Sequence, residues 1–153
     1  MIRNGRRLMA ELLSEPTLRI FAICAAILTL KLVFMVTLIG VLRNVRGVHI
    51  APEDYRFRGL TPGRPDELVE RVRRAHQNDV ENIPVFLAIG LLFALSGGYP
   101  TVAWWVFVVF TAARFLHTLF YLAALQPWRS VIFAVGSVAL GVMPVLLIWR
   151  TIG

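Results

Sequence analysis

Several residue types are scarce in this 153-residue chain, and each scarcity excludes a class of protein. Cys24 is the only cysteine, so neither a disulfide framework nor a cysteine-based metal site can form within one chain. Only 16% of the residues are charged, and no acidic residue follows Glu81. The three histidines lack metal-ligand spacing, and no glycine-rich phosphate loop occurs. We therefore expect no metal site.

The abundant residues are apolar, and they are grouped into four long tracts. Apolar residues make up 58% of the chain, and the mean hydropathy of +0.70 is too high for a soluble domain of this size. Each tract supplies the roughly 20 apolar residues that a helix needs to cross a bilayer. Strand-like alternation is absent from the sequence. The sequence therefore predicts an all-α, integral membrane four-helix bundle that forms a single domain over 1–153. The predicted helices lie at about 17–42, 66–97, 101–125 and 128–149.

The net charge of +7 predicts a membrane orientation and not a nucleic-acid partner. Nine arginines lie in the connections before helices 66–97 and 128–149 or at the start of helix 66–97, and five lie on the other side. Because basic loops stay in the cytoplasm, we expect both connections there and both chain ends outside. The basic segment before helix 17–42 has no clear cleavage site, so we expect it to be retained, with that helix as a signal anchor.

Polar residues recur inside two of the apolar tracts with helical spacing. On helix 66–97 the spacing i, i+4, i+7, i+8, i+11 places five on one face: Glu70, Arg74, Gln77, Asn78 and Glu81. On helix 101–125 the spacing i, i+3, i+4, i+7 groups Arg114, His117, Thr118 and Tyr121. An ionisable residue within the bilayer costs about 2.5–3.5 kcal/mol, so each needs a partner or a hydrated cavity.

Two interpretations fit these polar residues. Arg114 and Glu81 could form a structural ion pair between neighbouring helices, but this pair leaves the other polar residues unexplained. The sequence therefore favours a polar site in the cytoplasmic half of the bundle, with Glu81 at its floor facing Arg114. Lys31, in the middle of helix 17–42, has no partner that the sequence identifies.

The stretch PWRS, residues 127–130, begins the last predicted helix. Arg129 and Ser130 are expected where free backbone N–H groups and the positive end of the helix dipole lie. This arrangement suits an anion or a thiolate.

These motifs together resemble one family of membrane proteins. The segments ERVRRAHQNDVENI, PVFLAIGLLFALSG, ARFLHTLFYL and PWRS are similar to the MAPEG family, membrane-associated proteins in eicosanoid and glutathione metabolism, over about 120 residues. The chain looks closest to the branch of microsomal glutathione transferases and microsomal prostaglandin E synthases. The resemblance implies a homotrimer in the bacterial inner membrane or endoplasmic reticulum, with glutathione held between subunits on the cytoplasmic side.

The resemblance also assigns roles to residues by position. It implies a catalytic set near the glutathione sulfur and in the loop before helix 66–97: Arg129, Ser130 and Asp54. It implies a larger glutathione-binding set: Arg43, Arg74, Gln77, Asn78, Glu81, Arg114, His117 and Tyr121. Arg43 matches a basic residue supplied by the adjacent subunit. At position 77 this chain has glutamine, whereas the resemblance implies arginine at this position in the prostaglandin E synthases.

The resulting hypothesis is an enzyme that conjugates glutathione, as its thiolate, to hydrophobic electrophiles entering from the bilayer, with reduction of lipid hydroperoxides as a further activity. Three alternatives stay open. One is a glutathione-dependent prostaglandin E synthase-like isomerase, and another is a non-enzymatic lipid-binding protein. The third is a small transporter or channel, in which the intramembrane charges would line a conducting path.

Overall fold

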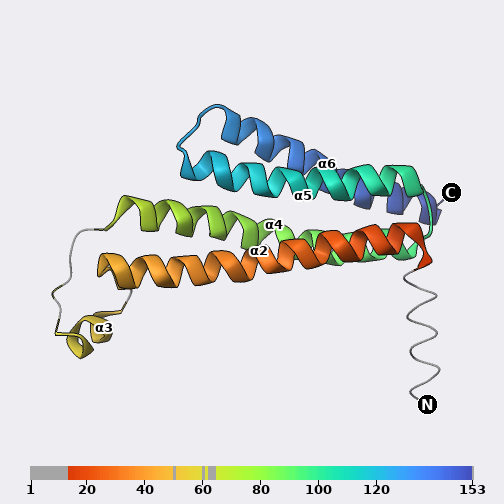
Figure 1. Ribbon diagram of the computed structural model, residues 1–153. Coiled ribbons are helices and arrows are strands. Elements are labelled where there is room, and N and C mark those ends of the chain that lie inside the picture. The colour runs from red at the N-terminus through yellow and green to blue at the C-terminus, as the bar shows by residue number, and fades with distance from the viewer. Residues whose placement is uncertain (1–13, 50, 60, 62–64, 153) are drawn as a thin grey trace, which may run out of the picture.

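The structure is a computed structural model that describes residues 14–49, 51–59, 61 and 65–152. The described part of the chain is all-helical: α2 (Pro16–Arg46), α3 (Pro52–Phe57), α4 (Glu67–Leu95), α5 (Pro100–Leu122) and α6 (Trp128–Ile152) (Figure 1). The four long helices are each long and apolar enough to cross a membrane, which confirms the predicted class. The basic N-terminal segment 1–13 lies outside the described residues, so the structure does not test the expectation that this segment is retained.

Local sequence explains where the helices begin. Proline occupies the first helical position of α2 and α5, where its missing N–H costs nothing. Asp66 caps α4 by accepting a hydrogen bond from the backbone N–H of Val69 at 3.0 Å. The connection between α2 and α4 contains α3, which the sequence did not predict. The hydroxyl of Tyr55 in α3 accepts a hydrogen bond from the backbone N–H of His49 at 2.9 Å.

The helices pack as two antiparallel pairs, α2 with α4 and α5 with α6, and α4 also packs against α5 (Figure 1). The last turn of α2, α3, the first turns of α4 and the α5–α6 connection therefore lie at one end of the bundle, here called the α3 end. The α4–α5 turn and the start of α2 lie at the opposite end. This arrangement brings segments from four parts of the sequence together at the α3 end.

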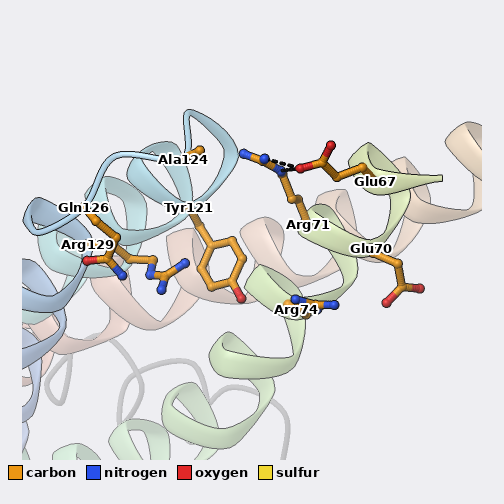
Figure 2. A pocket seen from close by; sticks show the side chains of 8 residues that line it. All are labelled: Glu67, Glu70, Arg71, Arg74, Tyr121, Ala124, Gln126 and Arg129. Carbon is orange, nitrogen blue, oxygen red and sulfur yellow. Dashed lines mark hydrogen bonds and ion pairs between the residues drawn. The ribbon is translucent and has the colours of Figure 1, made fainter. Parts of the chain in front are cut away.

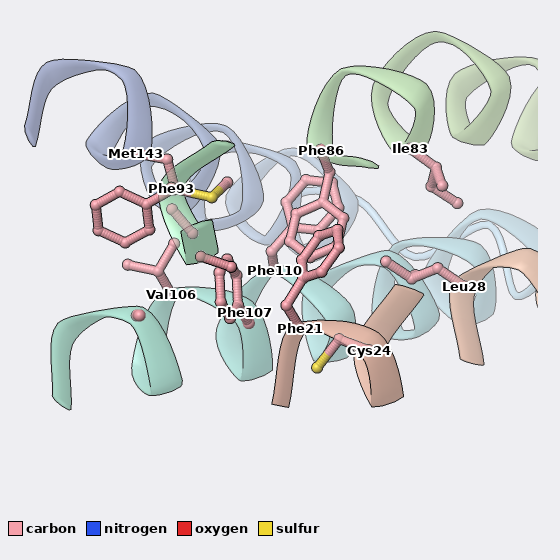
Figure 3. Close-up of a cluster of buried hydrophobic side chains, with 13 residues drawn as sticks. Phe21, Cys24, Leu28, Ile83, Phe86, Phe93, Val106, Phe107, Phe110 and Met143 are labelled. Atoms are coloured by element: carbon pink, nitrogen blue, oxygen red, sulfur yellow. The ribbon is translucent and has the colours of Figure 1, made fainter. Parts of the chain in front are cut away.

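An aromatic core fills the half of the bundle away from the α3 end (Figure 3). Phe86 of α4 stacks on Phe110 of α5 with ring centroids 4.5 Å apart and meets Phe107 edge-on at 5.8 Å. Phe21 of α2 joins the same cluster. Such contacts stabilise the bundle by dispersion and close packing. The buried side chains of Lys31, Asp79, Arg114 and His117 lie outside this aromatic cluster, whereas buried Thr17 lies in the first turn of α2.

Candidate functional site

A cavity of about 320 Å³ opens at the α3 end, between the first turns of α4 and the α5–α6 connection (Figure 2). Eight residues line it: Glu67, Glu70, Arg71, Arg74, Tyr121, Ala124, Gln126 and Arg129. Three of them, Arg74, Tyr121 and Arg129, belong to the set that the sequence predicted. Glu70 lies on the polar face that the spacing predicted, and Arg71 beside it was expected near the mouth of the site. Glu67, Ala124 and Gln126 were not predicted, because their place depends on the way α4 meets the α5–α6 connection.

The charges of the cavity are only partly paired within the chain. Arg71 donates to the Glu67 carboxylate through Nε at 3.1 Å and through Nη2. Glu70 accepts from Arg73 Nη2 at 2.8 Å. No carboxylate of the described residues forms an ion pair with Arg74 or Arg129. These two cations are therefore available to an anionic ligand.

Arg129 is held by two neighbours in the cavity wall. Its guanidinium carbon lies 4.4 Å from the ring centroid of Tyr121, in a cation–π contact. With the side-chain oxygen of Gln126 turned toward it, Arg129 Nε donates to that oxygen at 3.1 Å. The Gln126 amide nitrogen then donates to Ser130 Oγ at 3.2 Å. Ser130 is exposed and is linked to Arg129 through this amide.

The backbone at the start of α6 differs from the expectation. The N–H of Arg129 donates to the Leu125 carbonyl at 3.1 Å, and the N–H groups of Ser130 and Val131 donate to the Pro127 carbonyl at 2.9 and 3.2 Å. The prediction of free amides at Arg129 and Ser130 is wrong, because the tight α5–α6 connection supplies its own acceptors. Stabilisation of an anion here therefore depends on side chains.

Arg114 lies behind the cavity and is fully buried. Its Nη1 donates to Asn78 Oδ1 at 2.7 Å, and its guanidinium lies 5.6 Å from the Phe110 ring and 5.7 Å from the Phe133 ring. The predicted Arg114–Glu81 pair is wrong: Glu81 is exposed and accepts from Gln77 Nε2 at 3.0 Å. Asn78 occupies the position facing α5, one helical turn before Glu81.

A buried ionic cluster was missed by the sequence analysis. Lys31 Nζ of α2 forms an ion pair with the Asp79 carboxylate of α4 and donates to Thr118 Oγ1 of α5 at 2.8 Å. All three side chains are buried. A signal was available, because Asp79 lies four residues from both Ala75 and Ile83, on the apolar face of α4. Lys31, the only lysine, required a carboxylate partner within the bilayer.

The other predicted residues fall outside the cavity wall. His117 is buried beside Tyr121, with ring centroids 5.8 Å apart. Arg43 near the end of α2 and Asp54 on α3 do not line the cavity, and Asp54 is exposed. Gln77 and Glu81 lie on an exposed face of α4. One chain thus unites Arg74, Tyr121 and Arg129 with Ser130 beside them.

Comparison with known proteins assigns the chain to a family. Residues 21–149 match the model of the MAPEG family, and the chain belongs to this family, as the sequence motifs suggested.

Two groups of relatives are similar over most of their length. Microsomal glutathione S-transferase 1 of Sus scrofa is 42% identical over 134 residues, covering 84% of this chain and 86% of that protein. The protein of the same name from Homo sapiens is 41% identical with the same coverage. Prostaglandin E synthase of Homo sapiens is 35% identical over 140 residues, covering 90% of this chain and 92% of that protein.

Proposed function

We propose that this protein is a membrane-bound glutathione transferase that conjugates the glutathione thiolate to hydrophobic electrophiles. The observation that carries the proposal is the cavity at the α3 end, in which Arg74 and Arg129 face a ligand space without an internal carboxylate partner. Glutathione has two carboxylates, one ammonium and a thiol, so its site needs cations, an anion and a group that stabilises a thiolate. The names and identities of the relatives support the same activity.

The ammonium, the thiol and one of the two carboxylates of glutathione each have a counterpart in or near this cavity. Arg74 is placed to bind a carboxylate, and Glu70 or Glu67 to bind the ammonium. Glu81, which the family resemblance assigns to glutathione, lies on the outer face of α4 and is a candidate ligand for the part of glutathione that extends beyond one subunit. Arg129 and Ser130 are the candidates for the sulfur.

The contribution of thiolate stabilisation to the conjugation rate at pH 7 can be calculated from the ionised fraction of the thiol. A free thiol with a pKa of about 8.5 is about 3% ionised at pH 7. Lowering its pKa by about two units raises the ionised fraction to roughly 75%, a gain of about 25-fold, or about 1.9 kcal/mol. The sulfur then attacks the electrophilic carbon, and the leaving group departs with its bonding electron pair. Arg129 supplies the positive charge for the first step.

The same proposal includes a homotrimer with glutathione between subunits. Arg74, Gln77 and Glu81 form an exposed polar face on α4, which would be costly in contact with lipid tails. A neighbouring subunit that covers this face removes that cost and can contribute Arg43 and Asp54 from its own α3 end. The arginine distribution favours the α3 end as the cytoplasmic side, in a bacterial inner membrane or the endoplasmic reticulum.

A conjugation assay tests the proposed function. Purified protein in lipid nanodiscs is mixed with glutathione and a halonitroarene, and product formation is followed together with thiolate absorbance in the ultraviolet. We expect saturable conjugation that depends on protein and on glutathione. Absence of both glutathione binding and conjugation would overturn the proposal. Glutathione-independent solute flux through protein-containing vesicles would instead support a channel.

An isomerase acting on prostaglandin endoperoxides is the second candidate. The relatives named prostaglandin E synthase, at 35% identity over 90% of the chain, favour it. Gln77 counts against it, because the family resemblance implies arginine at this position in those enzymes. A glutathione-dependent endoperoxide isomerisation assay on the same nanodiscs decides between the two. Isomerisation faster than conjugation would favour the isomerase.

A further inference from the structure

We propose that Gln126 is a positioning residue that holds Arg129 in place and leaves the Ser130 hydroxyl hydrogen free to reach the glutathione sulfur. The catalytic meaning of this contact rests on the proposed function, whereas the contact itself does not. Gln126 lines the cavity and lies beside Arg129 in the connection between α5 and α6 (Figure 2). It was absent from the sequence-based set.

The orientation of the Gln126 amide follows from the hydrogen-bonding capacity of its neighbours. A guanidinium has donors only, so the amide oxygen and not the nitrogen must face it. In that orientation the oxygen accepts from Arg129 Nε at 3.1 Å and also from Nη2. The amide nitrogen then donates to Ser130 Oγ at 3.2 Å. Both ends of the amide are satisfied at once, and the reverse orientation would place nitrogen against nitrogen.

This orientation determines what Ser130 can do. Because Ser130 Oγ accepts from the amide nitrogen, its own hydrogen remains available for another acceptor. A thiolate is such an acceptor, and donation to it stabilises the charged form. In the reverse orientation Ser130 Oγ would donate to the Gln126 oxygen, and its only hydrogen would be consumed. The Gln126 amide thus keeps Ser130 as a donor toward the cavity.

Arg129 is restrained from two sides by the same arrangement. The centroid of the Tyr121 ring lies 4.4 Å from the guanidinium carbon of Arg129. The Gln126 side-chain oxygen accepts hydrogen bonds from Arg129 Nε and Nη2. Within the described residues, Nη1 has no hydrogen-bond partner, so it can meet an anion in the cavity. A fixed guanidinium loses less entropy on binding an anion than a mobile one.

Two substitutions separate positioning from simple packing. Gln126→Met keeps the length of the side chain but removes both hydrogen-bonding groups, so Arg129 and Ser130 lose their common partner. Gln126→Glu still accepts from Arg129, but it also accepts from Ser130 and adds a negative charge near the sulfur. Gln126 is exposed, so neither change disturbs the packed core. Ser137→Ala, an exposed polar site farther along α6, is the matched control.

The readout is the pH dependence of kcat/KM for the electrophile at saturating glutathione, which reports the ionisation of the enzyme–glutathione complex. We expect Gln126→Met to raise the apparent pKa of the bound thiol and to lower kcat/KM at pH 7 about five- to tenfold, the loss of roughly one hydrogen bond to a charged group. We expect Gln126→Glu to raise that pKa further. The Ser130 hydroxyl hydrogen would then be donated to the new carboxylate, and the carboxylate would repel the thiolate. Ser137→Ala should match the wild type. Wild-type pH profiles in both Gln126 variants would overturn the proposal.

A second measurement tests the contact without glutathione. An arginine-selective dicarbonyl reagent modifies the protein, and peptide mass spectrometry gives the rate at Arg129, with Arg150 as the internal reference. We expect Gln126→Met to accelerate modification of Arg129 about fivefold and to leave Arg150 unchanged. Equal rates would overturn the contact even if conjugation is observed. Faster modification in a protein that neither binds nor conjugates glutathione would refute the proposed function and support the contact.

Discussion

Arg129 combines three properties that a thiolate site requires: a permanent charge, a fixed orientation and access to the cavity. The backbone amides at the start of α6 cannot replace it, because those of residues 129–131 already donate to carbonyls. The electrostatic stabilisation of sulfur in the proposed reaction therefore depends on this one guanidinium and on the Ser130 hydroxyl. A single substitution should remove most of it.

We predict that Arg129→Ala returns the pKa of the bound thiol toward about 8.5, because a nearby cation favours the ionised form. Conjugation at pH 7 should fall by about 25-fold, and the difference should shrink as the pH rises above that value. The measurement is kcat/KM for the electrophile at saturating glutathione as a function of pH, together with the absorbance of the bound thiolate. Arg150→Ala, at the opposite end of α6, is the control. An unchanged profile in Arg129→Ala would refute this mechanism.

The charges of Lys31 and Asp79 differ from that of Arg129, because they form a buried ion pair and do not line the cavity. Removing one partner leaves the other charged and buried, which typically costs about 3–5 kcal/mol. We predict this loss of stability for Lys31→Met and a smaller loss for Lys31→Met combined with Asp79→Leu. Thermal unfolding in detergent measures both. If the double variant were no more stable than the single one, the pair would not be the source of the effect.

At the scale of helices, the α5–α6 contact depends on a glycine that lies against Arg114. A Cβ atom at Gly136 would lie 3.2 Å from Arg114 Nη2 and 3.3 Å from the Ala113 Cβ, closer than ordinary van der Waals contact. Both neighbours belong to α5, which is packed on its other side by α2 and α4. An added Cβ would require these packed neighbours to move by a few tenths of an ångström, which the close α5–α6 packing resists.

We predict that Gly136→Ala lowers the free energy of unfolding by about 1–3 kcal/mol, the usual cost of overpacking. Gly141→Ala on the same helix is the matched control, because its Cβ would meet nothing within 4 Å. The control should be neutral or more stable by up to about 1 kcal/mol, since alanine favours a helix. Thermal unfolding of both variants in the same detergent gives the comparison, and equal stability would contradict it.

At the scale of the whole molecule, the exposed polar face of α4 would be costly for a single chain in contact with lipid tails. We predict that native mass spectrometry of nanodisc-embedded protein gives three times the 17.2 kDa chain mass. We expect each polar face to be covered by the next subunit in such a trimer. A monomer that binds glutathione with full affinity would contradict this prediction. Glu81→Gln tests the face itself, and it should weaken glutathione binding, trimer stability or both.

Much of the architecture could be predicted because the information is local. A run of about 20 apolar residues specifies a spanning helix whatever its neighbours are, and Asp66 and Pro100 mark helix starts through their own chemistry. The family was also readable from short motifs such as RAHQNDVEN. Of the cavity, the sequence assigned ligand or catalytic roles to Arg74, Tyr121 and Arg129, and it placed Glu70 on the same polar face. The short α3 was missed, because six residues carry too little pattern to predict a helix.

The sequence by itself determined the membrane class, the four long helices and the region in which the polar residues gather. Only the tertiary structure decided which of them meet. Asn78, Asp79 and Glu81 lie within one helical turn, so spacing alone could not select the partner of Arg114 or of Lys31. The rotation of α4 about its own axis determines which of these side chains faces each partner. This rotation is set by the packing of α4 against α2 and α5, which are distant in sequence. The same packing brought Gln126 to the cavity and turned Glu81 outward.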